Sequence, residues 1–328
     1  MRFGVIGAGR IGKIHGANIA RRGDSAVAYV TDADAVAAQA LAAAVGARVG
    51  TVEDILADAS VEAVAICSPT DTHADLIERA AKAGKAIFCE KPVDLSAERV
   101  RVCLEVVQAT GARLMIGFNR RFDPNFASLR KRVADGEIGV VEIVQITSRD
   151  SSPPPVSYIA RSGGMFRDMM IHDFDMARFL LGEEPVTVSA FGSALIDPAI
   201  GIAGDVDTAV VILQTQSGKV AEISNSRRTT YGYDQRIEAH GALGMLAASN
   251  VRETTVEHGG AHGFTSDKAL DFFLDRYEAA YRRELDAFID AVSGDRAPNP
   301  SGLDGLQALV LADAAYLSWK TGQTVKLG

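Results

Sequence analysis

Two polar residues at helical spacing are the first candidates for chemistry. Asp168 and His172 stand four residues apart, so on an α-helix both would lie on one face, one turn from each other. A carboxylate there can orient the imidazole, which leaves His172 as a general base for the proton of an alcohol. The structural alternative is a polar helix face with a hydrogen-bonded histidine. A metal site that adds Asp173 and Asp175 is disfavoured, because these four residues do not share one face.

A glycine-rich segment at residues 7–12, with the sequence GAGRIG, indicates the binding of a pyrophosphate. It follows a predicted strand and opens a predicted helix. The first glycine permits a tight turn, the second lets a phosphate approach the backbone, and the third allows close packing of helix on strand. The N-terminus of the helix then offers N–H donors to the anion. The expected contacts are Gly7, Gly9, Arg10, Ile11 and Gly12.

Asp32 distinguishes between the two nicotinamide cofactors. It stands twenty residues after Gly12, at the end of the second predicted strand, where a carboxylate accepts hydrogen bonds from an adenosine ribose. The 2′-phosphate of NADP would meet this negative charge, and residues 33–41 contain no Arg or Lys to offset it. The sequence therefore predicts NAD as the cofactor.

Polar residues also end two further predicted strands, at the carboxyl edge where open α/β sheets bind ligands. Lys91 directly follows one of these strands, and this position favours a functional lysine over a surface one. His73 is expected either near the nicotinamide or as a helix cap, and Pro92 is a candidate for a cis peptide bond. The expected cofactor contacts at this edge are Ser68, Pro69, Thr70, His73, Glu90 and Lys91.

The elements that must position these residues follow from the hydrophobic pattern. In residues 1–119, short apolar runs alternate with helical patterns, which predicts a doubly wound parallel sheet, a Rossmann domain. The predicted strands cover residues 3–6, 26–30, 61–66, 86–89 and 114–118, and the helices cover 11–22, 33–45, 72–83 and 97–109.

Residues 120–328 predict a second domain of α+β type, which would bind the substrate and form oligomers. Its strands are joined by short turns, so neighbouring strands are expected to be mainly antiparallel. The apolar run at 210–213 predicts that a second subunit covers the outer face of this sheet. The predicted strands are 140–147, 187–195, 207–215, 219–226, 236–240, 244–248 and 254–258, and the helices are one beginning at Pro124, 168–181, 268–292 and 302–320.

Composition excludes several classes of protein. The 328 residues carry a formal net charge of −8 and no basic run longer than residues 130–132, which argues against nucleic acid as a partner. No apolar stretch approaches the roughly 20 residues of a membrane span. The three cysteines form no CxxC pair, so no zinc site is indicated, and a reducing cytoplasm is expected.

The sequence resembles the glucose-fructose oxidoreductase and inositol dehydrogenase (Gfo/Idh/MocA) family over essentially its whole length. Residues 148–155 (SRDSSPPP), the helix after them and the YDQR segment are most similar to inositol 2-dehydrogenases. The motifs that carry the resemblance are GAGRIG at 7–12, CSPTDTH at 67–73, EKP at 90–92, GFNRRFDP at 117–124, GGMFRDMMIHDFDMARFLLG at 163–182 and YDQRIEAHGALGML at 233–246.

The resemblance implies roles for particular residues. His172 would be the acid/base, Asp168 its partner, and Lys91 the group that holds and polarises the reacting hydroxyl. Arg120 and Tyr233 match positions that face the substrate in inositol enzymes. The resemblance also implies an open-sheet second domain that often forms tetramers, with the last helix packing back on the first domain. Arg149 and Asp150 occupy a variable stretch and receive no role.

The expected activity is NAD-dependent oxidation of myo-inositol to 2-keto-myo-inositol, as a step of inositol catabolism. Alternatives of the same chemistry are oxidation of scyllo-inositol, an aldose or a sugar acid. A different class is an NAD-dependent glycoside hydrolase or lyase, in which the cofactor is not consumed. A third alternative, a silent sugar sensor, should have lost the Lys91, Asp168 and His172 set that this chain retains.

Overall fold

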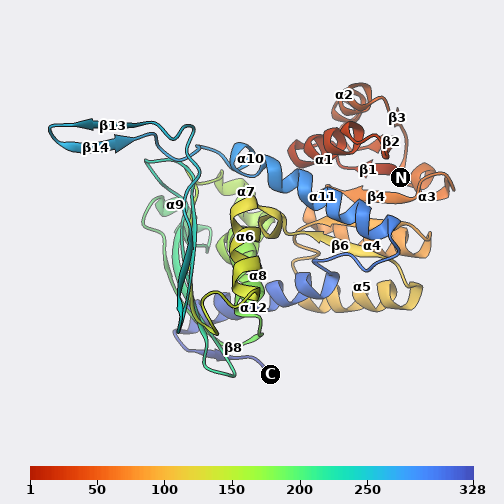
Figure 1. Ribbon diagram of the computed structural model, residues 1–328. Helices are drawn as coiled ribbons and strands as arrows, with labels where there is room; N and C mark the ends of the chain where they lie inside the picture. The colour runs from red at the N-terminus through yellow and green to blue at the C-terminus, as the bar shows by residue number, and fades with distance from the viewer. The chain divides into compact units, whose positions relative to one another are not determined.

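The computed structural model describes the backbone of residues 1–328 and every side chain except that of residue 160. The chain divides into two compact units (Figure 1). The first comprises Met1–Phe122 and Ala280–Val310, and the second comprises Asp123–Ala279 and Leu311–Gly328. Each unit is built on its own large sheet, and the chain returns to the first unit after passing through the second.

A six-stranded parallel sheet forms the centre of the first unit, in the order β3-β2-β1-β4-β5-β6. Every residue of β4 and β6 is buried, as expected for parallel strands that are covered on both faces. The expected Rossmann sheet is confirmed. Its strands are β1 (Arg2–Ile6), β2 (Ala26–Thr31), β3 (Arg48–Val49), β4 (Ala63–Ile66), β5 (Ala86–Glu90) and β6 (Leu114–Gly117).

The helices of the first unit begin where the sequence supplies caps. Asp34 caps α2 and Ser96 caps α5, and each of these helices ends at a glycine with positive φ. Three short elements, β3, α3 and η2, were not predicted, since they are too short to show a hydrophobic period. The helices are α1 (Arg10–Arg21), α2 (Ala35–Val45), α3 (Val52–Ala57), η1 (Thr70–Thr72), α4 (His73–Lys82), α5 (Ala97–Thr110), η2 (Asn119–Phe122), α11 (Glu278–Ser293) and the first half of α12 (Gly302–Thr321).

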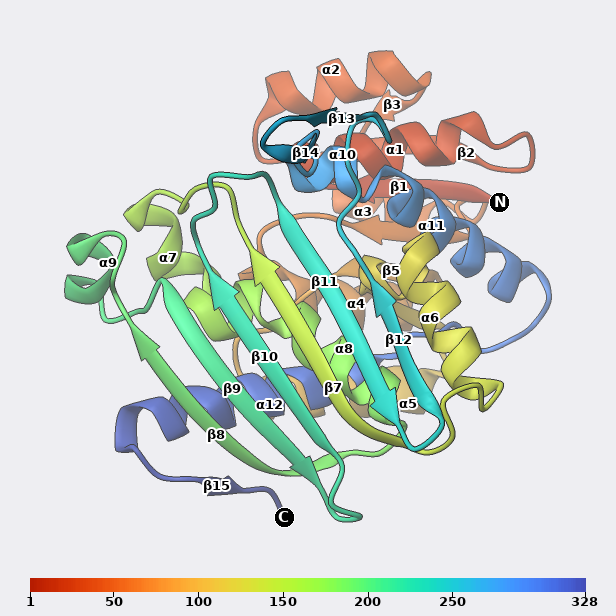
Figure 2. The ribbon, with the colours of Figure 1, turned by 60° about the vertical axis from the view of Figure 1, so that its left-hand side comes forward.

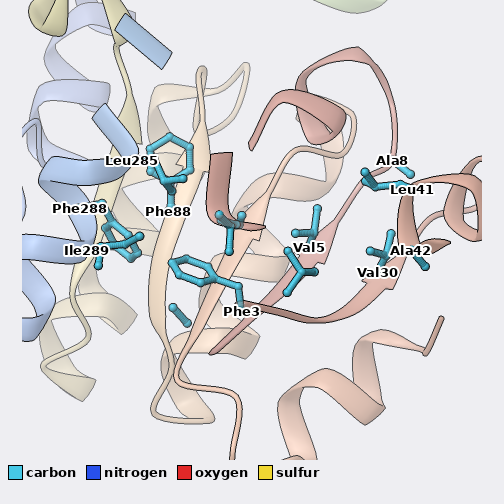
Figure 3. Packing of buried hydrophobic residues seen from close by; sticks show 14 of the residues in the cluster. Phe3, Val5, Ala8, Val30, Leu41, Ala42, Phe88, Leu285, Phe288 and Ile289 are labelled. Carbon is cyan, nitrogen blue, oxygen red and sulfur yellow. The ribbon is translucent and has the colours of Figure 1, made fainter. Parts of the chain in front are cut away.

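The core of the first unit joins the N-terminal strands to a helix from the far end of the chain. Phe288 of α11 lies with its ring 6.0 Å from that of Phe3 and 5.9 Å from that of Phe88. Leu285 and Ile289 pack into the same cluster (Figure 3). Burial of such side chains is worth about 1.5–3 kcal/mol each, so α11 is an integral part of this unit.

A seven-stranded mixed sheet forms the second unit, in the order β12-β11-β7-β10-β9-β8-β15 (Figure 2). Its pairs are antiparallel except for β7 with β10, which are parallel. The expected mainly antiparallel sheet is confirmed. Its strands are β7 (Val141–Arg149), β8 (Pro185–Ser193), β9 (Thr208–Thr215), β10 (Val220–Ser226), β11 (Asp234–Gly241), β12 (Gly244–Ala248) and β15 (Val325–Lys326).

Helix α8 packs on the inner face of this sheet, against β7 and β10. No helix in the described part of the chain is long and apolar enough to cross a membrane. The remaining elements are α6 (Pro124–Ala134), α7 (Val156–Ser162), a π-helical turn η3 (Met165–Met169), α8 (Ile171–Leu181), α9 (Pro198–Ile202), α10 (Phe273–Arg276) and a two-stranded hairpin of β13 (Glu257–Gly260) and β14 (Gly263–Ser266).

Three predictions for the second unit were wrong. The strand expected at 254–258 belongs to the separate β13–β14 hairpin, whose residues are all exposed. The helix expected at 268–292 is interrupted at Tyr277, between α10 and α11. The helix expected from Asp168 instead begins within the π turn. There the Met170 N–H donates to the Met165 carbonyl, five residues back, whereas an α-helical N–H donates to the carbonyl four residues back.

Candidate functional site

The glycine segment makes the turn from β1 into α1. Gly7 has a φ of 104°, and a Cβ there would lie 2.5 Å from the Cys67 carbonyl group. A Cβ on Gly12 would lie 1.9 Å from the Gly7 carbonyl oxygen. A Cβ on Gly9, in contrast, would meet nothing within 4 Å. The fold itself therefore requires Gly7 and Gly12, whereas Gly9 keeps open the space in which a pyrophosphate would approach the start of α1.

Asp32 ties the glycine segment to the next helix. Its carboxylate accepts the Ala8 N–H at 2.5 Å and the Asp34 N–H at 2.8 Å. The cap of α2 is Asp34 rather than Asp32, so Asp32 is not merely a helix cap. Its remaining oxygen lone pairs can accept ribose hydroxyls beside the turn. Arg10 and Ile11 form the first turn of α1 at the same place, and Arg10 is exposed.

The segment after β4 is held by its own hydroxyls and by a histidine. Ser68 and Thr72 share a hydrogen bond of 2.6 Å, and the Thr72 hydroxyl donates to the Pro69 carbonyl. His73 is the first residue of α4, and its ring is buried. Its two ring nitrogens lie 2.8 Å from the carbonyl oxygens of Ser68 and Pro92. His73 therefore links the ends of β4 and β5.

Glu90 is the last residue of β5. Lys91 and Pro92 follow it, and the peptide bond between them is cis. The Glu90 carboxylate lies 2.7 Å from Nε2 of His15, a buried residue of α1. Glu284 of α11 is also buried and lies 3.8 Å from the same nitrogen. This His15, Glu90 and Glu284 cluster lies directly next to Lys91 in the chain.

Burial shifts the pKa of one carboxyl of this cluster and of two nearby thiols. Burial, and after it the negative charge of Glu90, raises the pKa of Glu284 well above its usual value. Burial, and after it the negative charge of Glu90, also raises the pKa of the Cys67 and Cys89 thiols well above the ordinary range. Burial thus favours the neutral form of the Glu284 carboxyl, and it disfavours the reactive thiolate form of the two cysteines.

In the second unit, Asp168 and His172 lie on either side of the junction between the π turn and α8. Both side chains are partly exposed. The Tyr158 hydroxyl, from α7, donates to the Asp168 carboxylate at 3.2 Å. The four-residue spacing therefore crosses two helix types, and the regular α-helical geometry that we expected for this pair does not apply.

A buried polar network lies under the residue that follows His172. The Asp173 carboxylate accepts the Ser148 hydroxyl at 2.6 Å and the Asn225 amide at 2.9 Å. The Gln235 amide oxygen accepts the Tyr277 hydroxyl at 3.1 Å and lies 3.2 Å from the Ser148 hydroxyl oxygen, whose single hydrogen points to Asp173. These bonds fasten α8 to β7, β10 and β11 through groups that water does not reach.

The two other residues predicted to face a substrate, Arg120 and Tyr233, belong to different units, and Arg149, which received no role, belongs to the second. Arg120 is buried in η2 of the first unit. Tyr233 is buried just before β11 of the second, with its ring edge-on to Tyr277 at 6.0 Å. Arg149 ends β7 and donates to the Ser224 hydroxyl at 3.2 Å.

Sequence reasoning missed several residues of these arrangements, among them His15, Glu284 and Tyr158. His15 stands three residues after Gly12 on the buried face of α1, and this position was the available signal. Glu284 gave none, because a glutamate on an amphipathic helix is ordinarily exposed. Tyr158 lies in a short helix behind a proline-rich stretch that reads as a loop.

Two family patterns together match almost the whole chain. Residues 1–118 match the oxidoreductase family, NAD-binding Rossmann fold, and residues 130–327 match the oxidoreductase family, C-terminal alpha/beta domain. Both patterns carry the Gfo/Idh/MocA name. The match to the first pattern confirms the prediction of an NAD-binding domain.

Curated relatives and solved structures agree with this match. The chain is 60% identical to an inositol 2-dehydrogenase of Rhizobium meliloti, over 97% of this chain and 96% of that protein. It is 46% identical to a myo-inositol 2-dehydrogenase of Thermotoga maritima, over 100% and 98%. A myo-inositol dehydrogenase structure from Corynebacterium glutamicum is 44% identical and superposes with a TM-score of 0.96, over 100% and 99% of the two chains. A scyllo-inositol dehydrogenase of Lactobacillus casei, solved with NAD(H) and scyllo-inositol, is 28% identical with a TM-score of 0.92, over 99% and 98%.

Proposed function

Because this chain belongs to the Gfo/Idh/MocA family of NAD-binding oxidoreductases, we propose that it oxidises myo-inositol at C2 to 2-keto-myo-inositol. The observation that carries the substrate is the 60% identity to an inositol 2-dehydrogenase over nearly both whole chains. The glycine segment and Asp32 support NAD as the cofactor, since Gly9 leaves room for a pyrophosphate and Asp32 presents a carboxylate to a ribose.

NAD, when bound, supplies the acceptor for the hydride that leaves the substrate carbon. His172 takes the proton of the reacting hydroxyl as the general base. Lys91 donates a hydrogen bond to the same oxygen and stabilises the negative charge that develops on it. Asp168 orients the imidazole and stabilises its protonated form. Arg120 and Tyr233 are proposed to bind the remaining hydroxyls of the ring.

The proposal also covers assembly and location. Apolar side chains stand exposed on the outer face of the second sheet, among them Phe191 on β8, Ile212 on β9 and Ile143 on β7. We propose that a second copy covers this face and that the protein is a homotetramer or a dimer. The three cysteines are free, and we place the enzyme in the cytoplasm, where thiols remain reduced, and in inositol catabolism.

NADH absorbance with a panel of inositol isomers, aldoses and sugar acids tests the proposal, with NADP assayed alongside. We expect NADH to form with myo-inositol and NAD. Turnover with scyllo-inositol alone would transfer the assignment to the activity named for the Lactobacillus casei neighbour. NAD binding without NADH formation on any member of the panel would contradict the dehydrogenase and favour a reaction that returns the hydride.

A further inference from the structure

Lys91 lies between two residues that buried histidines hold in place. On one side, the Glu90 carboxylate meets Nε2 of His15 at 2.7 Å. On the other, the Pro92 carbonyl oxygen meets Nδ1 of His73 at 2.8 Å. Both histidines are essentially inaccessible to solvent. The residues directly before and directly after Lys91 are thus each held by a buried histidine, Glu90 through its side chain and Pro92 through its backbone carbonyl.

The contacts of His73 fix its protonation. Its Nδ1 faces the Pro92 carbonyl oxygen and its Nε2 faces the Ser68 carbonyl oxygen, each at 2.8 Å. A carbonyl oxygen accepts hydrogen bonds and cannot donate them. A neutral imidazole has only one N–H, so one of the two contacts would bring together two lone pairs in a buried place. Both contacts are satisfied only when each ring nitrogen carries a hydrogen.

The surroundings of His73 place opposing electrostatic effects on such an imidazolium. It is the first residue of α4, where the helix dipole disfavours a cation. Two charge-assisted hydrogen bonds to carbonyl oxygens replace the hydration that burial removes, and they act at contact distance on the ring itself. Through these two contacts the ring joins the end of β4 to the turn after β5.

We propose that His73 is a positioning residue for Lys91, and that it acts as a doubly protonated imidazole that clamps the Ser68 and Pro92 carbonyl groups together. The proposal rests on the proposed function in one respect, since it takes Lys91 as the group that meets the reacting hydroxyl. Of the two contacts, the one to Pro92 acts directly on the residue that follows Lys91, whereas the one to Ser68 acts on Lys91 only by anchoring the ring at the end of β4. Both ring nitrogens of His73 are engaged by these carbonyl oxygens, so the residue acts through Lys91.

Nuclear magnetic resonance on the full-length wild-type protein with ¹⁵N-labelled histidine tests the protonation state. A His73→Asn spectrum assigns the His73 signals among those of the six histidines. We expect both ring nitrogens of His73 to show the signals of protonated nitrogen at neutral pH. A neutral ring with one unprotonated nitrogen would overturn the clamp. This measurement needs neither substrate nor turnover.

A matched pair of substitutions tests the positioning. In His73→Asn, the side-chain NH₂ takes the place of Nδ1 and keeps the donor to Pro92. In His73→Gln, it takes the place of Nε2 and keeps the donor to Ser68. We expect kcat to fall by ~10-fold or more in His73→Gln and by a few-fold at most in His73→Asn, since misplacing a catalytic group by ~1 Å costs up to ~100-fold. A purely structural role would instead affect both variants alike.

The outcomes separate this inference from the proposed function. If Lys91→Met leaves turnover unchanged, the role of Lys91 fails whatever the state of His73. If Lys91→Met abolishes turnover while both His73 variants keep wild-type kcat, the positioning role fails alone. Melting temperature and NAD affinity are measured for every variant, and equal losses in His73→Asn and His73→Gln would also overturn the inference.

Discussion

At the residue scale, the role of Asp32 at the cofactor site can be separated from helix capping, because a different residue caps α2. Asp32 holds the Ala8 N–H of the glycine turn, and it is the carboxylate proposed to face the ribose. Asp34, two residues on, only caps α2. The two side chains therefore offer a matched pair of substitutions. Replacing Asp32 should alter the preference between NAD and NADP, and replacing Asp34 should not.

We expect Asp32→Ser to narrow the preference for NAD over NADP by ~10-fold or more, because the charge that repels a 2′-phosphate is removed. Steady-state kcat/KM with each cofactor measures this. Asp34→Ala is the control, which should lower the free energy of unfolding by about 1 kcal/mol through the lost cap and leave the preference unchanged. An unaltered preference in Asp32→Ser would place the ribose contact elsewhere.

His172 is the residue whose loss should affect chemistry and spare binding. In His172→Ala we expect kcat/KM for the alcohol to fall by at least ~10²-fold, the usual contribution of a general base. NAD affinity, measured by fluorescence titration, should stay near that of the wild type, since the cofactor contacts predicted here all lie in the first unit. Turnover close to normal would remove His172 from the mechanism.

At the element scale, buried polar groups connect segments that are remote in the sequence. The His15, Glu90 and Glu284 cluster joins α1, β5 and α11. The Asp173 network joins α8 to three strands of the second sheet. A buried polar group without its partner costs about 1–3 kcal/mol, so each connection restricts how these elements can pack.

The pKa of Glu284 makes stability depend on pH. Because burial raises this pKa in the folded state, its contribution to the free energy of unfolding is fully present below the unfolded value near 4.5 and declines as pH rises toward the folded value. Glu284→Gln, which cannot ionise, removes this decline. We therefore expect the melting temperature of Glu284→Gln, relative to that of the wild type, to increase as pH rises from about 5 to 8.

The control for this measurement is Asp286→Asn, on the same helix, whose carboxylate pairs with Arg22 and is 38% exposed. Its difference in melting temperature from the wild type should stay nearly constant over the same range, since this substitution leaves the buried Glu284 carboxyl in place. A constant difference between Glu284→Gln and the wild type would show that Glu284 is ionised in the folded protein.

At the scale of the whole molecule, the outer face of the second sheet bears on assembly. Phe191 is 71% exposed on a strand of a seven-stranded sheet, with Ile212 on the neighbouring strand. We expect the double substitution Phe191→Asp and Ile212→Asp to reduce the oligomer to a smaller species, because the charges would have to be buried at the interface. Light scattering after size-exclusion chromatography measures the mass.

Val102→Asp is the control for assembly, since Val102 is an exposed apolar residue on α5 of the first unit. It should leave the mass unchanged. If the double variant keeps the mass of the wild type and remains folded, a different surface mediates assembly.

The sequence determined those features whose causes lie close together in the chain. The strand, the turn and the helix that contain the glycine segment could be predicted, because the hydrophobic period and the glycines that define them lie within about 30 residues. Asp32 was proposed as a cofactor contact from its spacing to Gly12, and Lys91 as a functional residue from its place after a strand; both roles stay predictions. The cofactor followed from the same local pattern and is confirmed by the family match.

Tertiary structure decided the features that depend on residues far apart. The pairing of His15 with Glu284, and the place of α11 in the first unit, arise from packing across most of the chain. The π turn at Asp168 and the separate hairpin of β13 and β14 depend on neighbouring elements and leave no period in the sequence. Local propensity fixes φ and ψ over a few residues, whereas the partner of a buried polar group is chosen only when the core closes around it.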